Sequence, residues 1–392
     1  MSKAFWKVLA AEGMRILTAP LRLLPIKKNR ILFTGLTGGN SYDYSCNPKY
    51  IYEYLKQHEQ GQYEYVWAVS DPGRFSFLTR EGVKLVKHFS PASFPYLLTA
   101  KVIVTNGSYA PWFAFRKKQY VINTWHGGGA YKNVENETPR ADWATKQRAR
   151  FCAGNIDLFL ASCRTQENEM IRTTYQYKGE VLRAGTPRND MLVKGDTQQA
   201  ADRVREHFAI PGEGRIVLFA PTYRNLRSRA HLDGDALLKE LEKSGEKWYL
   251  ISRYHRYQNE SSNVRITGER ILQGADYPDM QELLCAADVM ITDYSSCVWD
   301  YGFLKRPCLL YVPDKAEYTE KNGFYVELDR WPYPQADTME KLLEELSLLL
   351  TDPGSMAAYR QRIEEHMKEL GSYETGEAAA AVAEKIKEQT NG

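Results

Sequence analysis

The sequence predicts an α/β protein of two doubly wound, Rossmann-like domains that face one another across a cleft. The chain has 392 residues, more than one hydrophobic core usually supports, so two domains are expected. Short apolar runs of β-forming residues alternate with stretches of helical length, which is typical of parallel sheets with crossover helices on both faces. These runs form two series, and we therefore expect one sheet from each half of the chain.

The composition excludes several other classes of protein. With 43% hydrophobic and 26% charged residues, the chain has the make-up of an ordinary globular protein rather than a disordered or fibrous one. A net charge of +3 gives no reason to expect a nucleic-acid partner. The six cysteines form no CxxC pair and have no regular spacing, so neither a zinc site nor a disulfide framework is indicated and a reducing cytoplasm is expected. No run of about 18 uncharged apolar residues predicts a transmembrane helix.

Residues 1–29 predict an amphipathic helix that lies in a membrane surface. Aromatic residues and leucines alternate there with bases such as Lys7, Arg15 and Arg22. Arg15 lies within the apolar stretch, which a cleavable signal peptide would keep free of charge. A helix with its apolar face in the acyl boundary and its bases at anionic headgroups explains this pattern. A helix that packs its apolar stripe on the protein body is the alternative.

The apolar runs place the two domains at residues 30–190 and 191–375, with a C-terminal helix or tail at residues 376–392. The boundary is expected between GTPRND, residues 185–190, and a helix near residues 197–208. The expected strands are 30–36, 63–70, 101–106, 119–125, 158–163 and 180–185 in the first domain, and 215–221, 248–254, 263–267, 289–294 and 307–312 in the second.

Functional residues are expected directly after the strands, because ligands of doubly wound sheets bind beyond the carboxyl ends of the strands. The residues found there are TGGN at 37–40, His126 with three glycines, Thr222 and Arg224, His255 and Arg256, and DYSS at 293–296. Histidines, arginines, hydroxyls and glycines together suit a ligand that carries phosphate.

His126 is the expected general base. It lies between Trp125 and three glycines in the stretch NTWHGGGAYK. Glycines let the backbone approach a ligand and adopt positive φ, so the imidazole can project without a Cβ crowding behind it. With an ordinary pKa near about 6.5, the imidazole can remove a proton from a hydroxyl. A turn histidine that only caps backbone groups is the alternative, and the candidate phosphate-binding residues favour the base.

Ser295 and Ser296 follow a strand and precede a stretch with helical apolar spacing, so they are expected at a helix N-terminus. Free N–H groups and the positive end of the helix dipole attract anions there, although a plain N-cap explains the same residues.

Arg224 can form bidentate contacts with phosphate, and His255 can stabilise charge on a transferring phosphate. A surface salt bridge is the alternative for Arg224, and a buried, hydrogen-bonded imidazole is the alternative for His255.

Five motifs together resemble the CDP-glycerol glycerophosphotransferase family of teichoic acid synthesis. They are WHGGG, GTPRND, FAPTYR, the histidine after YLISRY, and MQELLCAADVMITDYSS with the aspartate that follows it, in this order from about residue 120 to 310. The resemblance implies a GT-B-like fold whose C-terminal domain holds most of the nucleotide donor. It also implies a peripheral protein at the cytoplasmic face of the plasma membrane that acts on undecaprenyl-diphosphate-linked acceptors.

The resemblance assigns roles to individual residues. The expected catalytic residues are His126 and His255; the expected ligands of a CDP-glycerol or CDP-ribitol donor are Thr222, Arg224, Asp293, Ser295, Ser296 and Asp300; and the expected substrate-binding residues are Gly127, Gly128 and Arg188. The commoner form of the first motif is WHGTP, whereas this chain has Gly128 and Gly129 in place of Thr and Pro. The difference removes a hydroxyl beside the base, which leaves the acceptor and the transferred polyol open.

The implied reaction is phosphoryl transfer. An acceptor hydroxyl, deprotonated by His126, attacks the β-phosphorus of CDP-glycerol in line, and CMP leaves while Arg224, His255 and the helix terminus hold the phosphates.

No metal or other cofactor is expected, because no carboxylate pair of the DxD type follows a strand. Asp276 and Asp279 are expected in a solvated turn. Asp300 is expected either to orient a donor group or to pair with Lys305 or Arg306.

Other functions share this architecture. A GT-B sugar transferase or a nucleotide-sugar epimerase would use a UDP-sugar, and a membrane-associated scaffold would keep the fold without catalysis. Within the family, glycerol or ribitol donors, primase or polymerase activity, and teichoic acid or capsule products are all compatible with the motifs. At 392 residues with no further N-terminal domain, addition of one or a few units is expected. The amphipathic stripe can also serve contacts in an oligomer.

Overall fold

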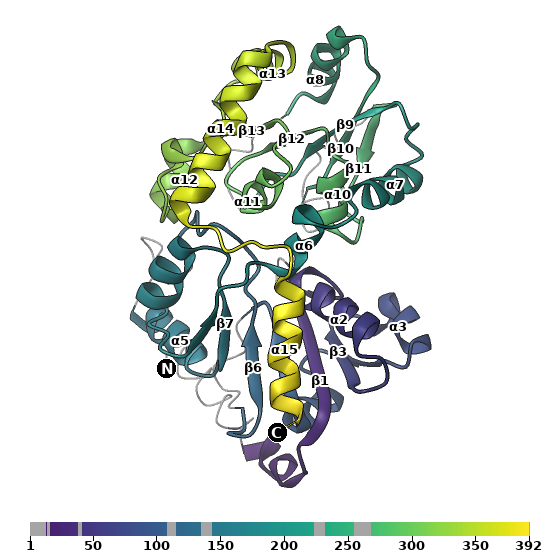
Figure 1. The fold of residues 1–392 in the computed structure, drawn as a ribbon, viewed down its shortest axis with the longest axis vertical. Coiled ribbons are helices and arrows are strands. Elements are labelled where there is room, and N and C mark those ends of the chain that lie inside the picture. The colour runs from purple at the N-terminus through teal and green to yellow at the C-terminus, as the bar shows by residue number, and fades with distance from the viewer. Residues whose placement is uncertain are drawn as a thin grey trace. The chain divides into compact units, whose positions relative to one another are not determined.

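The chain forms two compact units (Figure 1). The computed structural model describes residue 13 and residues 16–37, 41–107, 115–134, 143–222, 232–254 and 268–391. The first unit comprises Met1–His126, Ala141–Asp190 and Tyr373–Gly392, and the second comprises Gly127–Arg140 and Met191–Ser372. The chain passes from the first unit to the second between Asp190 and Met191, and the segment Gly127–Arg140 also belongs to the second unit.

The first unit is built on one sheet with the strand order β4-β3-β1-β5-β6-β7-β8, in which all neighbours are parallel. A short strand β2 pairs antiparallel with β1. The strands are β1 (Lys27–Thr37), β2 (Ser41–Asp43), β3 (Glu64–Val69), β4 (Lys84–Lys87), β5 (Ala100–Thr105), β6 (Tyr120–Asn123), β7 (Leu158–Leu160) and β8 (Glu180–Leu182). The helices are α2 (Cys46–His58), α3 (Phe77–Arg80), α4 (Phe94–Thr99), α5 (Trp143–Ala153), α15 (Ala378–Asn391), the π-helix η6 (Gln166–Thr174), and the 3-10 turns η1 (Ala19–Leu23), η3 (Pro72–Phe75), η4 (Pro91–Ser93) and η7 (Pro187–Asn189).

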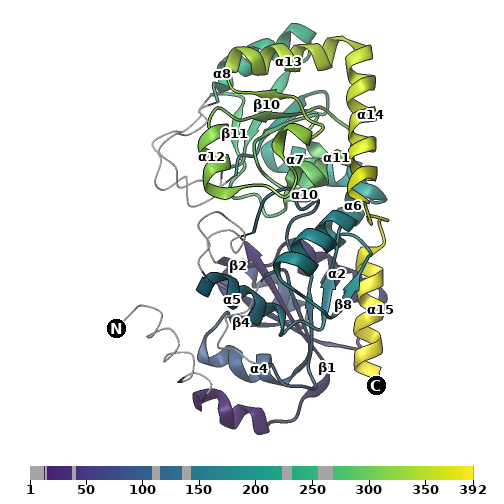
Figure 2. The ribbon, with the colours of Figure 1, turned by 90° about the vertical axis from the view of Figure 1, so that its left-hand side faces the viewer.

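Helices cover both faces of this sheet (Figure 2). On one face, Phe33 of β1 shares a buried cluster with Leu55 of α2 and Val382 of α15. On the other face, Leu32 shares a cluster with Leu98 of α4. Successive strand residues point to opposite faces, so a strand covered on both sides is apolar without alternation. This explains the unbroken apolar run in β1.

Helix α15, near the end of the chain, belongs to the first unit rather than forming a separate tail. The Asp190 carboxylate accepts hydrogen bonds from Ala378 N (2.9 Å) and Ala379 N (2.8 Å), and so caps the helix N-terminus. Val382 and Ile386 are fully buried against the sheet. The helix is therefore a structural part of the first unit, held by one carboxylate and an apolar stripe.

The second unit contains a parallel sheet with the strand order β11-β10-β9-β12-β13-β14. The strands are β9 (Arg215–Phe219), β10 (Trp248–Ser252), β11 (Ile271–Gln273), β12 (Val289–Thr292), β13 (Cys308–Tyr311) and β14 (Gln335–Ala336). The helices are α7 (Thr197–Phe208), α8 (Gly234–Leu241), α10 (Met280–Ala286), α11 (Cys297–Gly302), α12 (Lys315–Asn322), α13 (Met339–Thr351), α14 (Pro353–Leu370) and the 3-10 turns η8 (Glu242–Ser244) and η9 (Leu328–Arg330), while the short helix α6 (Asp190–Val193) spans the boundary between the units.

Most expected strands are present, and the differences have physical causes. Helix α7 occupies residues 197–208, as predicted. The expected strand at 263–267 lies outside the described residues, and the sheet edge there is β11. Strands β2, β4 and β14 were not predicted, because each has at most four residues and too few apolar ones to stand out. Asp279 was expected in a solvated turn, but it is 5% exposed and caps α10 by accepting from Gln281 N at 2.8 Å.

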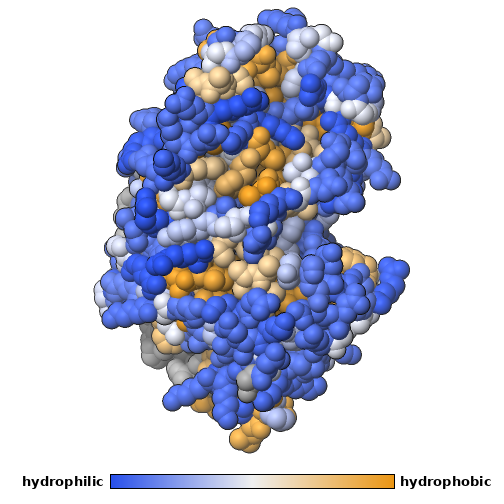
Figure 3. All heavy atoms as spheres, viewed as in Figure 1, coloured by the Kyte–Doolittle hydropathy of each residue, from blue (hydrophilic) through white to orange (hydrophobic). Residues whose placement is uncertain are grey.

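Residues 1–12 and 14–15 of the expected membrane helix lie outside the described residues, so this helix stays a prediction. In the described part, Ile16 is 73% exposed and Leu23 of η1 is 88% exposed, while Leu21 packs against the core beneath α4. Figure 3 shows apolar residues at the end of the first unit where η1 lies in Figure 1. Among the described helices, none has the length and apolarity that a bilayer crossing requires.

Candidate active site

The expected general base lies in a turn that the backbone does not favour by itself. Strand β6 ends at Asn123, and Trp125 then adopts a left-handed conformation with φ +52°. This conformation costs a residue with a side chain about 1–2 kcal/mol. The Asn123 Oδ1 accepts a hydrogen bond from Trp125 N at 2.8 Å, which holds the start of the turn. The turn leaves the next residue, His126, exposed to solvent.

The His126 ring is oriented by two contacts within the first unit. Its Nδ1 lies 3.0 Å from the backbone oxygen of Asn106, which follows β5. A carbonyl oxygen only accepts, so Nδ1 carries the proton and Nε2 is the basic nitrogen of the neutral ring. The ring also stacks on the Trp125 indole, with centroids 4.5 Å apart. These contacts suit a base that takes a proton at Nε2.

The glycines after His126 pack closely against the second unit's helix α11. A Cβ on Gly127 would lie 2.9 Å from Ser296 Oγ, and a Cβ on Gly128 would lie 2.0 Å from Cδ1 of the fully buried Trp299. Gly129 has φ +74°, a conformation that glycine adopts without steric cost. The absence of a side chain at Gly127 and Gly128 therefore makes room for Ser296 and Trp299, whereas the sequence had led us to expect that it makes room for a ligand.

The segment after the glycines is anchored in the core of the second unit. Lys132 forms an antiparallel bridge with Phe324, and the Tyr131 hydroxyl lies 3.1 Å from His366 Nε2. Burial lowers the pKa of His366 to about 4, so this imidazole is neutral at physiological pH. These contacts fix the glycine segment to the α/β core of the second unit.

The two expected donor-binding serines lie at the start of α11 and are half-buried. Ser296 is the N-cap residue without a side-chain capping bond, and Ser295 Oγ accepts from Cys297 N at 3.4 Å. Helix α11 begins directly after this pair, as the sequence indicated. Free N–H groups and hydroxyls at a helix N-terminus can bind a phosphate.

Thr222 and Asp293, both expected at the donor, are bonded to each other across the ends of β9 and β12. The buried Asp293 carboxylate accepts from Thr222 N at 2.9 and 3.0 Å and from Thr222 Oγ1 at 2.5 Å. It thereby fixes Thr222, which lies two residues before Arg224 in the sequence. Arg224 itself, and likewise His255 and Arg256, lie outside the described residues.

Asp300 is buried and accepts a hydrogen bond from Gln281 Nε2 at 3.0 Å. Its two suggested partners make other contacts: Lys305 pairs with Glu364, and Arg306 donates to the carbonyl oxygens of Cys285 (2.7 Å) and Ala287 (2.8 Å).

Arg188 was expected at the substrate, and its described contacts are with the His126 turn and with the start of α2. Its Nη1 donates to the His126 backbone oxygen at 2.8 Å and lies 3.2 Å from Cys46 Sγ. Its backbone N–H donates to Asn47 Oδ1 at 3.1 Å. Sequence patterns had not singled out Asn47 or Asn106, because neither belongs to a motif and both act through contacts with residues distant in sequence.

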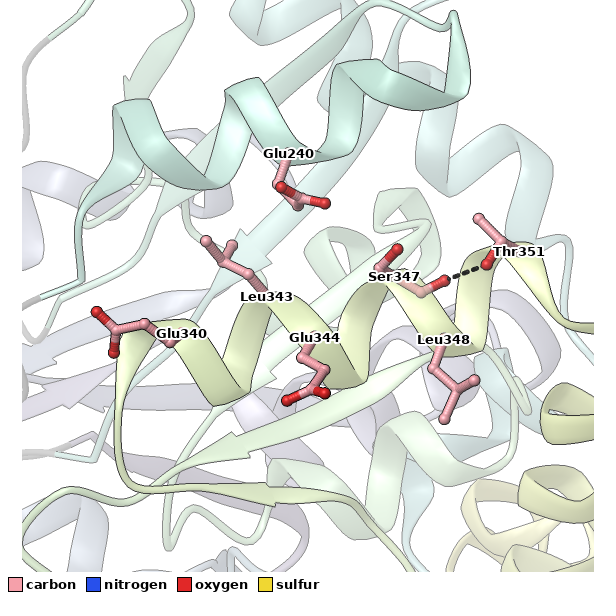
Figure 4. Close-up of a pocket in the computed structure, with 7 residues that line it drawn as sticks. All are labelled: Glu240, Glu340, Leu343, Glu344, Ser347, Leu348 and Thr351. Atoms are coloured by element: carbon pink, nitrogen blue, oxygen red, sulfur yellow. Dashed lines mark hydrogen bonds between the residues drawn. The ribbon is translucent and has the colours of Figure 1, made fainter.

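An acidic groove elsewhere in the second unit does not belong to this site. It has a volume of about 530 Å³, and its lining residues are Glu240, Glu340, Leu343, Glu344, Ser347, Leu348 and Thr351 (Figure 4). Glu240 of α8 points toward α13 in this view. Three carboxylates repel a phosphate-bearing ligand, and none of the expected site residues lines the groove.

Two units with parallel doubly wound sheets, and with glycines, hydroxyls and an exposed histidine after the strand ends, define an enzyme of the GT-B architecture. The family model for CDP-Glycerol:Poly(glycerophosphate) glycerophosphotransferase matches residues 16–388. The chain belongs to this family and is a transferase.

Relatives and solved structures agree with this assignment. The chain is 31% identical to a teichoic acid poly(glycerol phosphate) polymerase of Bacillus spizizenii, over 82% of this chain and 84% of the relative. It is 27% identical to the polymerase of the same description from Bacillus subtilis, over 82% of this chain but only 44% of that longer protein. The solved structure of the wall teichoic acid polymerase TagF matches 99% of this chain and 97% of that chain with a TM-score of 0.81 at 24% identity, which shows the same fold.

Proposed function

We propose that this chain transfers a polyol phosphate, in the first instance glycerol phosphate, from a CDP-polyol to a hydroxyl of an undecaprenyl-diphosphate-linked glycan, with release of CMP. The observation that carries the proposal is the His126 turn. Its exposed imidazole is held through Nδ1 by a backbone carbonyl, which leaves Nε2 to accept the proton of the attacking hydroxyl.

The reaction requires one bond to form and one to break. The acceptor oxygen bonds to the β-phosphorus, the bond from that phosphorus to the bridging oxygen breaks, and CMP carries that oxygen away. The acceptor proton passes to His126 Nε2. Such a transfer depends mainly on positioning and on stabilising the phosphate charge.

Residues of the second unit hold the donor in this proposal. Ser295 and Ser296 offer hydroxyls and the N-terminus of α11 to the phosphates, and Asp293 holds Thr222, which lies two residues before Arg224 in the sequence. Gly127, the residue after His126, packs on Ser296 within the second unit.

The remaining assignments complete the proposal. His255 acts as the second catalytic residue by stabilising charge on the transferring phosphate, and Arg224 and Asp300 take part in donor binding. Gly127, Gly128 and Arg188 serve the substrate side. The protein works peripherally at the cytoplasmic face of the membrane through its basic, apolar N-terminal segment. The exposed Ile16 and Leu23 support membrane contact.

A donor screen tests this function. The purified protein is given a short lipid-linked disaccharide acceptor with CDP-glycerol, CDP-ribitol or a UDP-sugar, and both nucleotide release and product mass are measured. Acceptor-dependent CMP release from a CDP-polyol, with a product heavier by polyol-phosphate units, is the expected result, and the mass also gives the number of units added. Turnover of the UDP-sugar alone would show that the residues serve a sugar transferase or epimerase instead.

A further inference from the structure

We propose that Asn47 and Arg188 form a buried brace that sets the position of the His126 imidazole, which makes both of them positioning residues for the transfer. The inference rests on the proposed function, in which His126 is the base. It gives Arg188 a role through His126 in addition to the expected place beside the substrate.

Asn47 supplies one half of the brace from the first turn of α2. Its side chain is fully buried. Its Nδ2 donates to the backbone oxygens of Thr124 (3.2 Å) and Trp125 (2.9 Å). Its Oδ1 accepts a hydrogen bond from the Arg188 backbone N–H at 3.1 Å. All of the described hydrogen bonds of this amide are therefore with the His126 turn or with Arg188.

Arg188 supplies the other half from the turn η7, far along the chain. Only 9% of the residue is exposed, and its Nη1 donates to the His126 backbone oxygen at 2.8 Å. The two side chains therefore bond three successive carbonyls, those of Thr124, Trp125 and His126. Hydrogen bonds from a guanidinium are stronger than those between neutral groups.

The turn needs this support because of its conformation. Trp125 is left-handed at φ +52°, which a residue with a side chain retains only when its surroundings determine it. If the three carbonyls lose their donors, the turn can relax and His126 Nε2 moves relative to the attacking hydroxyl. Misplacement of a reacting group by about 1 Å can cost about 100-fold in rate.

The matched control is Gln119, which precedes β6. Its buried side chain donates to the backbone oxygens of Leu97 (2.7 Å) and Ala100 (2.8 Å), so it also holds two carbonyls. These carbonyls lie at the opposite end of β6 from His126. Gln119→Ala thus removes the same number and kind of bonds as Asn47→Ala, without touching the turn.

The experiment measures kcat, the donor KM and the unfolding midpoint, at a temperature well below all midpoints. Asn47→Ala is expected to lower kcat by about 10- to 100-fold with little change in donor KM, while Gln119→Ala lowers stability but retains kcat. In the His126→Ala background, Asn47→Ala should have no further effect, because the brace acts only through His126.

Arg188→Lys is the second variant, since it keeps the charge but removes the planar donor to the His126 carbonyl. It is expected to lower kcat by about 10-fold with an unchanged donor KM. Wild-type kcat in both Asn47→Ala and Arg188→Lys, or equal losses with and without His126, would overturn the brace. Full activity of His126→Ala alone would instead overturn the proposed function.

Discussion

Replacing Gly128 by Ala should destabilise the protein through one identifiable contact. The new Cβ would lie 2.0 Å from Trp299 Cδ1, 2.5 Å from Nε1 and 2.7 Å from Cγ, whereas carbon atoms in contact are separated by about 3.5–4.0 Å. Trp299 is fully buried in α11 and its ring cannot move into solvent. Overpacking of this kind costs about 1–3 kcal/mol, and the short distances to a buried ring place this substitution near about 3 kcal/mol.

Thermal unfolding of the full chain measures this effect. In a domain of this size, 1 kcal/mol lowers Tm by about 2–4 °C, so we expect a decrease of about 6–12 °C. The control is Gly212→Ala, because a Cβ on Gly212 meets nothing within 4 Å, and its free energy of unfolding should change by no more than about 0.5 kcal/mol.

A double-mutant cycle separates this contact from other effects. Trp299→Ala alone should cost about 3–5 kcal/mol, but in that background Gly128→Ala should cost almost nothing, because the added methyl group enters the vacated space. Equal Tm values for the Gly128 and Gly212 variants, or additive losses in the cycle, would refute this reasoning. Agreement would mean that glycine at position 128, where the commoner motif has threonine, is required by Trp299.

Three further outcomes are expected. The pKa of His366 is about 4 in the folded chain and about 6.5 in the unfolded chain. The unfolded chain therefore binds the proton first, and stability falls as the pH decreases from about 6.5 to 4. In thermal unfolding, His366→Phe should reduce this loss of stability, and a replacement of the exposed His207 should not. Asp293→Asn places an amide against the donors of Thr222 and should lower the free energy of unfolding in urea by about 1–3 kcal/mol. An unchanged unfolding midpoint would show that this hydrogen bond does not stabilise the fold. A truncation of residues 1–17, which spares η1, should weaken sedimentation with anionic liposomes and leave the midpoint unchanged; equal sedimentation would refute the membrane segment.

The sequence was most informative where burial determines residue type. Strands covered on both faces are continuous apolar runs, so β1 and β9 could be located without coordinates. The edge strands β4 and β14 were not predicted, because an edge strand buries less side-chain surface and needs fewer apolar residues. The place of α15 was also unpredictable, since an amphipathic helix does not specify which sheet it covers.

The candidate site was predictable in its types of residue but not in its contacts. Position after a strand end made His126, Thr222 and Ser296 candidates, because the carboxyl edge of a parallel sheet collects ligand-binding groups. Asn47 gave no signal, because an asparagine at the start of a helix is usual for local hydrogen bonding. Its bonds to a turn far along the chain exist only after folding.

In the proposed reaction, His126 removes the acceptor proton during polyol-phosphate transfer. The most direct test of this role is the rate of acceptor-dependent CMP release from CDP-glycerol by wild type and by His126→Ala, with donor binding measured on both. We predict a decrease of about 100- to 10,000-fold in the variant with unchanged donor affinity. Equal rates in the two proteins, or no CMP from either CDP-polyol in the wild type, would contradict the account.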